Sequence, residues 1–301
     1  MPSKYDTSRI NKGIKVADLK VYEEDKIWSR YSNDKVDIGE ELARVIRSLS
    51  RCLPLKKDLR ALSLGSSDEP QFRILETAFR GGLYLLDVEK EALDIIKERA
   101  KRQRTGHVTA ILGDYNRIFQ NPLKTLNFLK GKLDGKRMNL VTLHHSLYYC
   151  YEIMWLSVLT NIYRNILAAK GAIHVVLMAA EDEDPNTTTW LYNHFVGKFF
   201  GYRNNQDLRK FKRDLGACPA FKDARILLRT NRVHFFVDDF EKFMAVIWMI
   251  LLYPAVHKYT PEQKEEITRF VYNRFWKKKR PLVQAQDHLV IYKGLGLKGI
   301  I

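Results

Sequence analysis

The chain has 301 residues, of which 46% are hydrophobic and 29% charged, and its formal net charge is +16. This composition is typical of a globular protein with a packed core, and it excludes an intrinsically disordered chain. The most apolar run, residues 243–256, is about 14 residues long and contains Pro254, whereas a membrane helix needs roughly 20 residues, so we expect no membrane span.

The three cysteines, Cys52, Cys150 and Cys218, lie far apart and outside any CxxC spacing. Such spacing predicts neither a disulfide framework nor a zinc site, and no other metal site is predicted. The first residues are polar and lack the apolar segment of a secretory signal peptide. We therefore expect a reducing compartment and a cytoplasmic protein.

The excess of positive charge is typical of proteins that bind phosphate-rich or other acidic partners. Basic residues concentrate at 97–104, 209–213 and 277–280, each near the end of an expected helix. Cations there favourably oppose the helix dipole, so solvated helix ends are the favoured explanation of each cluster and a nucleic-acid contact is the alternative. RNA stays open as a partner, and the sequence does not indicate an oligomeric state.

The expected elements begin with a polar segment, 1–37, which we interpret as an N-terminal arm or cap. Residues 37–52 have helical apolar spacing, and from residue 60 short apolar runs alternate with amphipathic stretches. The runs are ALSLG (61–65), GLYLLD (82–87), VTAILGD (108–114), MNLVTLHH (138–145) and AIHVVLMAA (172–180). Five strands separated by helices, the last of these helices near 151–169, predict right-handed crossovers and a largely parallel sheet.

The pattern changes after the fifth strand. Helices are expected at 187–200 and 206–215, a strand at 224–230 and a second at 233–237, then helices at 239–252 and 261–276 and a last strand at 288–294. Residues 238–287 then form a helical insertion within a core that spans 38–301.

Polar residues follow the first two strands, and an open α/β sheet binds its ligands at these carboxyl ends. Gly65, Ser66 and Ser67 form a tight turn into a helix, where the backbone N–H groups can bind a ligand; the turn alone can also explain the glycine. Asp87 ends the second strand, and its carboxylate can accept hydrogen bonds from the paired hydroxyls of a ribose. The alternative role for Asp87 is a helix N-cap.

The next two strands also end in polar residues. Asp114 can accept a hydrogen bond from an adenine amino group, and Tyr115 is available for stacking, although Gly-Asp is also a common turn. The fourth strand ends in HHSLYY, which contains His144, His145, Tyr148 and Tyr149. Buried imidazoles and phenols need polar partners, so this segment predicts a binding or catalytic role rather than core filling.

The series LSLGSSDEP, LYLLD, ILGDYN and NLVTLHHSLYY resembles the successive motifs of class I S-adenosylmethionine-dependent methyltransferases, over roughly residues 38–230 and the last strand. This resemblance implies an α/β fold with a Rossmann-like, mostly parallel seven-stranded sheet, helices on both faces, and S-adenosyl-L-methionine as the cofactor. It also implies cofactor contacts: Gly65, Ser66 and Ser67 at the methionine part, Asp87 at the ribose, Asp114 at the adenine and His144 near the sulfonium. The glycine loop departs from the family pattern, because two serines follow Gly65.

The HHSLYY segment and the helices after the fifth strand are also similar to small-molecule N-methyltransferases related to histamine methyltransferase. We therefore expect methyl transfer to a nitrogen or oxygen nucleophile of a small molecule. His145 or His144 is expected to remove the nucleophile's proton, since an imidazole titrates near neutral pH. The predicted walls of the substrate pocket are aromatic side chains, which can also hold a cationic amine: Tyr148, Tyr149, Tyr151 and Trp190.

Several alternatives stay open. A nicotinamide dehydrogenase normally needs G-x-G-x-x-G, and Ser67 and Pro70 occupy the later glycine positions, so this alternative is disfavoured. Methylation of base amines in DNA or of cytosine C5 is disfavoured, because the Asn-Pro-Pro-Tyr and Pro-Cys sequences that resemble those enzymes are missing after the fourth strand. An RNA or protein methyltransferase is compatible with the basic charge, and the atypical glycine loop is compatible with a non-catalytic binding protein that retains the fold.

Overall fold

The computed structural model describes residues 4–18, 31–53, 58–65, 71–235, 237–252 and 258–295. Ser66 and Ser67, both predicted to contact the cofactor, lie outside these residues. The chain divides into two compact units, which are described separately. We call residues 38–177, 208–229 and 287–301 the core unit, and residues 1–37, 178–207 and 230–286 the helical unit.

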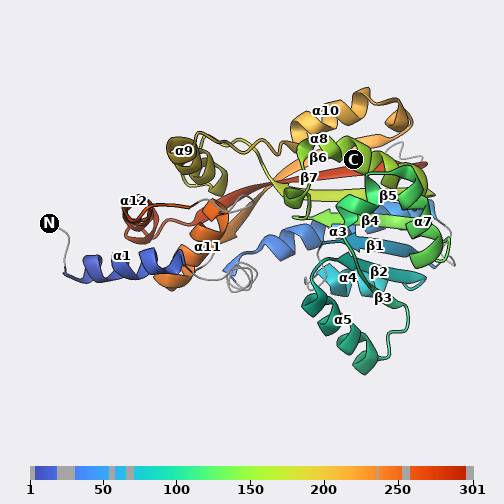
Figure 1. Ribbon diagram of the computed structural model, residues 1–301, viewed down its shortest axis with the longest axis horizontal. Coiled ribbons are helices and arrows are strands. Elements are labelled where there is room, and N and C mark those ends of the chain that lie inside the picture. The colour runs from blue at the N-terminus through green and yellow to red at the C-terminus, as the bar shows by residue number, and fades with distance from the viewer. Residues whose placement is uncertain are drawn as a thin grey trace. The chain divides into compact units, whose positions relative to one another are not determined.

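The strands form one seven-stranded sheet in the order β3-β2-β1-β4-β5-β7-β6 (Figure 1). Their bounds are β1 Arg60–Leu64, β2 Gly82–Asp87, β3 Val108–Leu112, β4 Met138–His144, β5 Leu167–Met178, β6 Arg225–Phe235 and β7 Leu282–Lys293. The pairs β1–β2, β1–β4, β2–β3 and β4–β5 are parallel. The predicted fold class, a mostly parallel seven-stranded α/β sheet, is confirmed.

Helices of the core unit cover both faces of the sheet, as Figure 1 shows for the region around β1 to β5. Their bounds are α3 Asp34–Cys52, whose first turn belongs to the helical unit, α4 Gln71–Ala78, α5 Lys90–Gln103, α6 Tyr115–Phe119, α7 Pro122–Lys132, α8 Glu152–Asn161 and α10 Leu208–Ala217. Leu42, Phe72 and Leu93 from α3, α4 and α5 pack with Leu83 and Leu85 of β2 on one face.

On the other face, α7, α8 and α10 supply Phe128, Trp155 and Phe211, which pack with Val141 and Leu143 of β4. Alternate side chains of the same strands thus enter two separate cores, as the period of a strand requires. Short turns of other types complete this unit: 3-10 helices at Leu147–Tyr149 and Pro219–Phe221, and a π-helix at Ile162–Ile166.

The helical unit contains α1 Lys4–Val16, α9 Thr188–Phe200, α11 Phe240–Leu252 and α12 Pro261–Val271, which continues as a π-helix over Tyr272–Trp276. Helix α1 packs on α11 and α12 around Gly13, whose backbone oxygen accepts a 3.0 Å hydrogen bond from the Trp248 indole. A Cβ at Gly13 would lie 2.9 Å from Met244, Phe240 and Thr268. Among the helices that the structure describes, none has the length and apolarity needed to cross a membrane.

The later elements differ from the sequence-based expectation. The two strands predicted at 224–230 and 233–237 are a single strand, β6, so that prediction is wrong. The polar side chain of Asn231 suggests a break between two strands, but it donates a 2.6 Å hydrogen bond to Asp37 Oδ1 of α3 and so is accommodated in mid-strand. Strand β7 likewise begins at Leu282, ahead of the predicted 288, because Gln286 donates to Asp37 Oδ2 at 2.7 Å and Gln284 donates to Gln286 at 2.9 Å.

Candidate active site at the carboxyl edge of the sheet

The segments that follow β1, β3 and β4 are held to the sheet beyond the last paired residues. The Gly65 N–H donates to the Leu86 carbonyl, the Gly113 N–H to the Asp87 carbonyl and the His145 N–H to the Val176 carbonyl, each at 2.9 Å. All of these residues belong to the core unit. The predicted residues on neighbouring strands therefore meet at one edge of the sheet, with their backbones in register.

Gly65 has a left-handed backbone, with φ +69°, and stands against Ser146 of the segment after β4. A Cβ at position 65 would lie 2.7 Å from the Ser146 Cβ, which real side chains do not tolerate. Glycine is thus required here by both conformation and space. The Ser146 hydroxyl is buried and has no hydrogen-bond partner among the described residues, so a polar atom is left unsatisfied beside the glycine.

The two predicted carboxylates lie at the ends of neighbouring strands and order their own loops. Asp87 Oδ1 accepts a 2.9 Å hydrogen bond from the Glu89 N–H. Asp114 is the N-cap of α6: its Oδ1 accepts from the Asn116 N–H at 2.9 Å, and its Oδ2 lies 3.4 Å from Nε of Arg117. An ionised carboxylate has about four lone-pair sites, so these bonds hold both groups in place without exhausting their capacity to accept.

Tyr115 and Asn116 connect the loop after β3 to the loop after β4. The Tyr115 hydroxyl donates to the Ser146 carbonyl at 2.7 Å, and Asn116 Nδ2 donates to the Tyr149 carbonyl at 3.0 Å. Tyr115 is buried, and burial raises the pKa of its phenol, so the hydroxyl stays protonated and continues to donate. The observed contacts give Tyr115 a role in joining the two loops, while its stacking on an adenine stays a prediction.

His145 and His144 differ in their surroundings although they are adjacent. His145 is half-buried, has a left-handed backbone with φ +53°, and stacks on Tyr148 with the ring centroids 5.9 Å apart. His144 is buried at 4% exposure, and its Nε2 lies 3.1 Å from Nδ1 of His174 on β5. Between the two candidate bases, His145 is therefore the more accessible to a bound molecule.

The remaining predicted tyrosines lie on the surface of the core unit. The exposed fractions are 64% for Tyr149 and 82% for Tyr151, and Ile153 beside them is 87% exposed. The segment that carries them is anchored by the buried Trp155, whose indole donates to the Cys150 carbonyl at 2.9 Å. Large apolar side chains standing in solvent are compatible with a place for a substrate, and a pocket wall stays a prediction.

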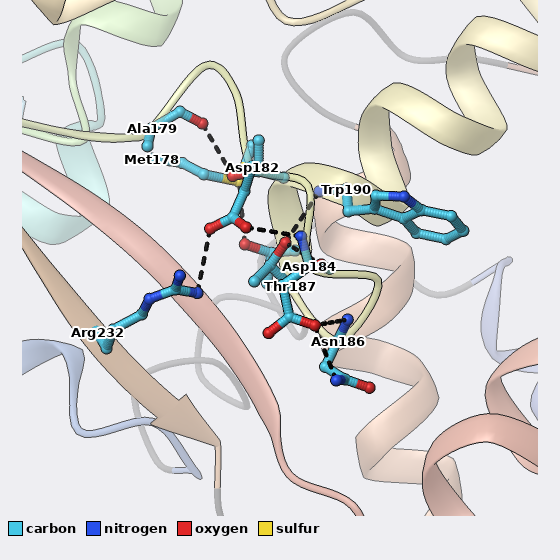
Figure 2. Close-up of polar contacts among 10 residues, drawn as sticks. Met178, Ala179, Asp182, Asp184, Asn186, Thr187, Trp190 and Arg232 are labelled. Atoms are coloured by element: carbon cyan, nitrogen blue, oxygen red, sulfur yellow. Dashed lines mark hydrogen bonds and ion pairs between the residues drawn. The ribbon is translucent and has the colours of Figure 1, made fainter.

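Trp190, the fourth predicted aromatic, belongs to the helical unit and is described there by itself, and its place in a pocket wall stays a prediction. Figure 2 shows the loop before α9: Asp182 pairs with Arg232 at 3.1 Å, and the Thr187 hydroxyl caps the helix by accepting from the Trp190 N–H at 3.2 Å. The Trp190 ring stacks on His194, with the ring centroids 4.4 Å apart. A structural stack within its own unit is thus the observed environment of Trp190.

Some polar residues near this edge are missed by reasoning from the sequence. Ser146 lies inside the HHSLYY segment without standing out there, although its unsatisfied hydroxyl lies beside Gly65. His174 and His288 are buried in strands β5 and β7. His174 is a lone polar residue in an apolar run, whereas His288 follows Gln286 and Asp287 and gives no signal of its own.

No protein-family model and no curated protein matches the chain. Solved structures of similar shape include a protein described as a putative sarcosine dimethylglycine methyltransferase from Galdieria sulphuraria, with 12% identity and a TM-score of 0.49, covering 86% of each chain. The plantazolicin methyltransferase BamL has 12% identity and a TM-score of 0.47, covering 95% of this chain and 97% of its own. The [4+2]-cyclase SpnF has 13% identity and a TM-score of 0.45, covering 84% and 81%. At these identities and TM-scores the likeness identifies no reaction.

Proposed function

We propose that the chain is an S-adenosylmethionine-dependent methyltransferase that modifies a nitrogen or oxygen nucleophile of a small molecule. The observation that carries this proposal is the contact between Gly65 and Ser146 at the carboxyl edge of the sheet. A left-handed glycine with no space for a Cβ lies there beside an unsatisfied buried hydroxyl. Asp87 and Asp114 follow at the ends of the next two strands, in the order in which a nucleoside extends along such an edge.

The residues present fit this cofactor. Gly65 and the Ser146 hydroxyl would hold its methionine part, Asp87 would accept from the ribose hydroxyls, and Asp114 would accept from the adenine amino group. Both carboxylates are already oriented by backbone N–H groups, so binding requires little reordering. When bound, S-adenosylmethionine supplies a methyl group activated by the neighbouring sulfonium.

The protein's own contribution is to align the nucleophile with that methyl group and to accept its proton. We assign the proton to His145, because its ring is half-buried and is oriented by stacking on Tyr148. Tyr148, Tyr149 and Tyr151 offer aromatic faces that suit a cationic amine, which supports a small basic acceptor. The three free cysteines support a cytoplasmic location, since a reducing compartment keeps thiols unpaired.

Cofactor binding is tested first, by measuring the melting temperature with S-adenosylmethionine and with its demethylated product, S-adenosylhomocysteine. A ligand at one hundred times its Kd stabilises a protein by about 2.7 kcal/mol, which is readily seen as a rise in melting temperature. Replacing Asp87 by Asn should raise Kd about tenfold, because a hydrogen bond to a charged acceptor is weakened. Asp94→Asn, on the exposed face of α5, is the matched control and should leave Kd unchanged. No shift at millimolar ligand overturns the proposal and favours the non-catalytic binding protein.

Methyl transfer is tested next, with radiolabelled S-adenosylmethionine and a panel of small amines and alcohols. His145→Ala should lower kcat by about 10²- to 10⁴-fold if His145 acts as the general base. The dissociation constant of the cofactor should change little, which separates loss of the base from loss of binding. Undiminished transfer by His145→Ala would remove His145 from the mechanism.

The formal charge of +16 favours a second candidate, an RNA methyltransferase. Transfer of label to RNA in preference to every small acceptor, with competition by unlabelled RNA, would support it over the small-molecule assignment.

A further inference from the structure

Three buried histidines from adjacent strands form a line in the core unit. Nε2 of His144 on β4 lies 3.1 Å from Nδ1 of His174 on β5. Nε2 of His174 lies 3.3 Å from Nδ1 of His288 on β7. The three residues are exposed by 4%, 0% and 1% respectively, so the four ring nitrogens that face one another are buried.

The middle ring constrains the other two. Burial, followed by the neighbouring His144 and His288, holds the pKa of His174 well below its usual 6.5. His174 is therefore neutral at pH 7, and a neutral imidazole has one N–H donor and one acceptor nitrogen. It donates to one neighbour and accepts from the other, and cannot donate to both.

Two arrangements satisfy both hydrogen bonds. In the first, His144 donates from Nε2 to His174, which donates from Nε2 to His288, and Nδ1 of a neutral His144 carries no proton. In the second, every N–H points the other way, and Nδ1 of His144 carries the proton. The tautomer of His144 is thus tied to that of His288, on a strand two places along the sheet.

We propose that His174 and His288 are positioning residues that couple the tautomer of His144, at the carboxyl edge of the sheet, to their own, so that the three rings share one tautomer. The value of this arrangement to catalysis rests on the proposed function, since His144 ends the strand beside Ser146 and His145. A fixed tautomer gives the edge either a fixed acceptor or a fixed donor at Nδ1, without a charge in the core.

The His288 end of the line borders a cavity in the core unit. His288 lines a cavity of about 350 Å³ together with residues of α3 and β6. Arg44, Arg51 and Arg229 line the same cavity, and the buried Glu41 carboxylate lies 3.0 Å from Nη1 of Arg44. These charged groups line the same cavity as His288 and bring hydrogen-bond donors and an acceptor to that end of the line.

The test is ¹⁵N NMR of protein labelled at its histidines, of which there are eight. Ring nitrogen shifts distinguish a protonated nitrogen from an unprotonated one. We expect His144, His174 and His288 to have the same tautomer in the unmodified protein. His174→Leu should convert His144 to a mixture of tautomers, whereas His174→Gln, whose amide donates and accepts, should retain a single one.

His107→Leu serves as the control, because His107 bonds the Glu76 carbonyl outside the line, and it should leave His144 unchanged. The rate of methyl transfer depends on the competent fraction, so His174→Leu should lower kcat about twofold or more without changing KM for the cofactor. Unlike tautomers along the line in the unmodified protein, or an unchanged His144 in His174→Leu, would overturn the proposal. The NMR result needs no cofactor, so a failure to bind S-adenosylmethionine would sink the proposed function and leave this inference standing.

Discussion

At the scale of single residues, the turn after β1 depends on one glycine. Gly65 has a left-handed φ, and a Cβ at this position would lie 2.7 Å from the Ser146 Cβ, so a methyl group there meets two separate penalties. The proposed cofactor site is therefore sensitive to the smallest substitution available.

Replacing Gly65 by Ala should lower the free energy of unfolding by about 1–2 kcal/mol from the backbone alone, with a further loss from the contact with Ser146. Urea denaturation measures the change. Gly106→Ala is the matched control, because nothing lies within 4 Å of its Cβ position and its φ is ordinary. Combining Gly65→Ala with Ser146→Gly should restore only the steric part, and a full recovery would contradict the role given to φ.

His174 predicts how stability depends on pH. Its folded-state pKa is depressed below the 6.5 of the unfolded chain, so the unfolded chain binds more protons as the pH falls below that value. The contribution of His174 to the free energy of unfolding therefore has its full value above pH 6.5. Below pH 6.5 the free energy of unfolding falls by about 1.4 kcal/mol for each pH unit.

Urea titrations at pH 7.5, 6.5 and 5.5 should show this slope in the unmodified protein and a shallower one in His174→Gln. Equal slopes in the two proteins would show that His174 is not the group responsible.

The sequence is informative about strand-end residues and silent about the histidine line. A polar residue after a predicted strand indicates the carboxyl edge directly, so Gly65, Asp87 and Asp114 are found from order alone. His174 and His288 are brought together by the pairing of strands distant in sequence, and no local pattern encodes that contact.

At the scale of elements, the parallel part of the sheet is predictable because each strand is a short apolar run bounded by turns. Helix α1 is expected from the sequence only as an arm, since its mean composition is polar and its partners, α11 and α12, lie more than 200 residues further along the chain. The sequence divides strand β6 in two because a polar Asn231 in mid-strand has the local pattern of a turn, and its partner Asp37 lies 194 residues earlier in the chain.

The packing of α1 provides a prediction for the helical unit. Gly13→Ala should destabilise the protein by about 1–3 kcal/mol, because the added methyl meets three side chains at 2.9 Å in a filled core. Gly131→Ala in α7 is the control: its Cβ position is open, and alanine in a helix is favoured over glycine by about 1 kcal/mol. Chemical denaturation should therefore give changes of opposite sign, and equal changes would contradict the described packing.

At the scale of the whole molecule, the net charge of +16 predicts behaviour that is separate from catalysis. We expect weak binding to RNA of any sequence, because basic residues release counterions from phosphates. Fluorescence anisotropy should show an affinity that falls steeply between 50 and 200 mM salt, by about 10³-fold or more if six or more phosphates are contacted. Cofactor affinity should change far less over the same range. A salt-resistant, sequence-selective RNA complex would instead favour RNA as the substrate.

The left-handed backbone of His145 means that the residue that most favours stability at this position differs from the one that the proposed activity requires. Glycine adopts φ +53° without the strain that a side chain adds, so His145→Gly is expected to match or exceed the unmodified protein in stability as it loses the imidazole. A selection for heat resistance alone would therefore discard this histidine, whereas a selection that also required turnover would keep it. Directed evolution under the two regimes would thus distinguish a working catalyst from a retained fold, even before the methyl acceptor is identified.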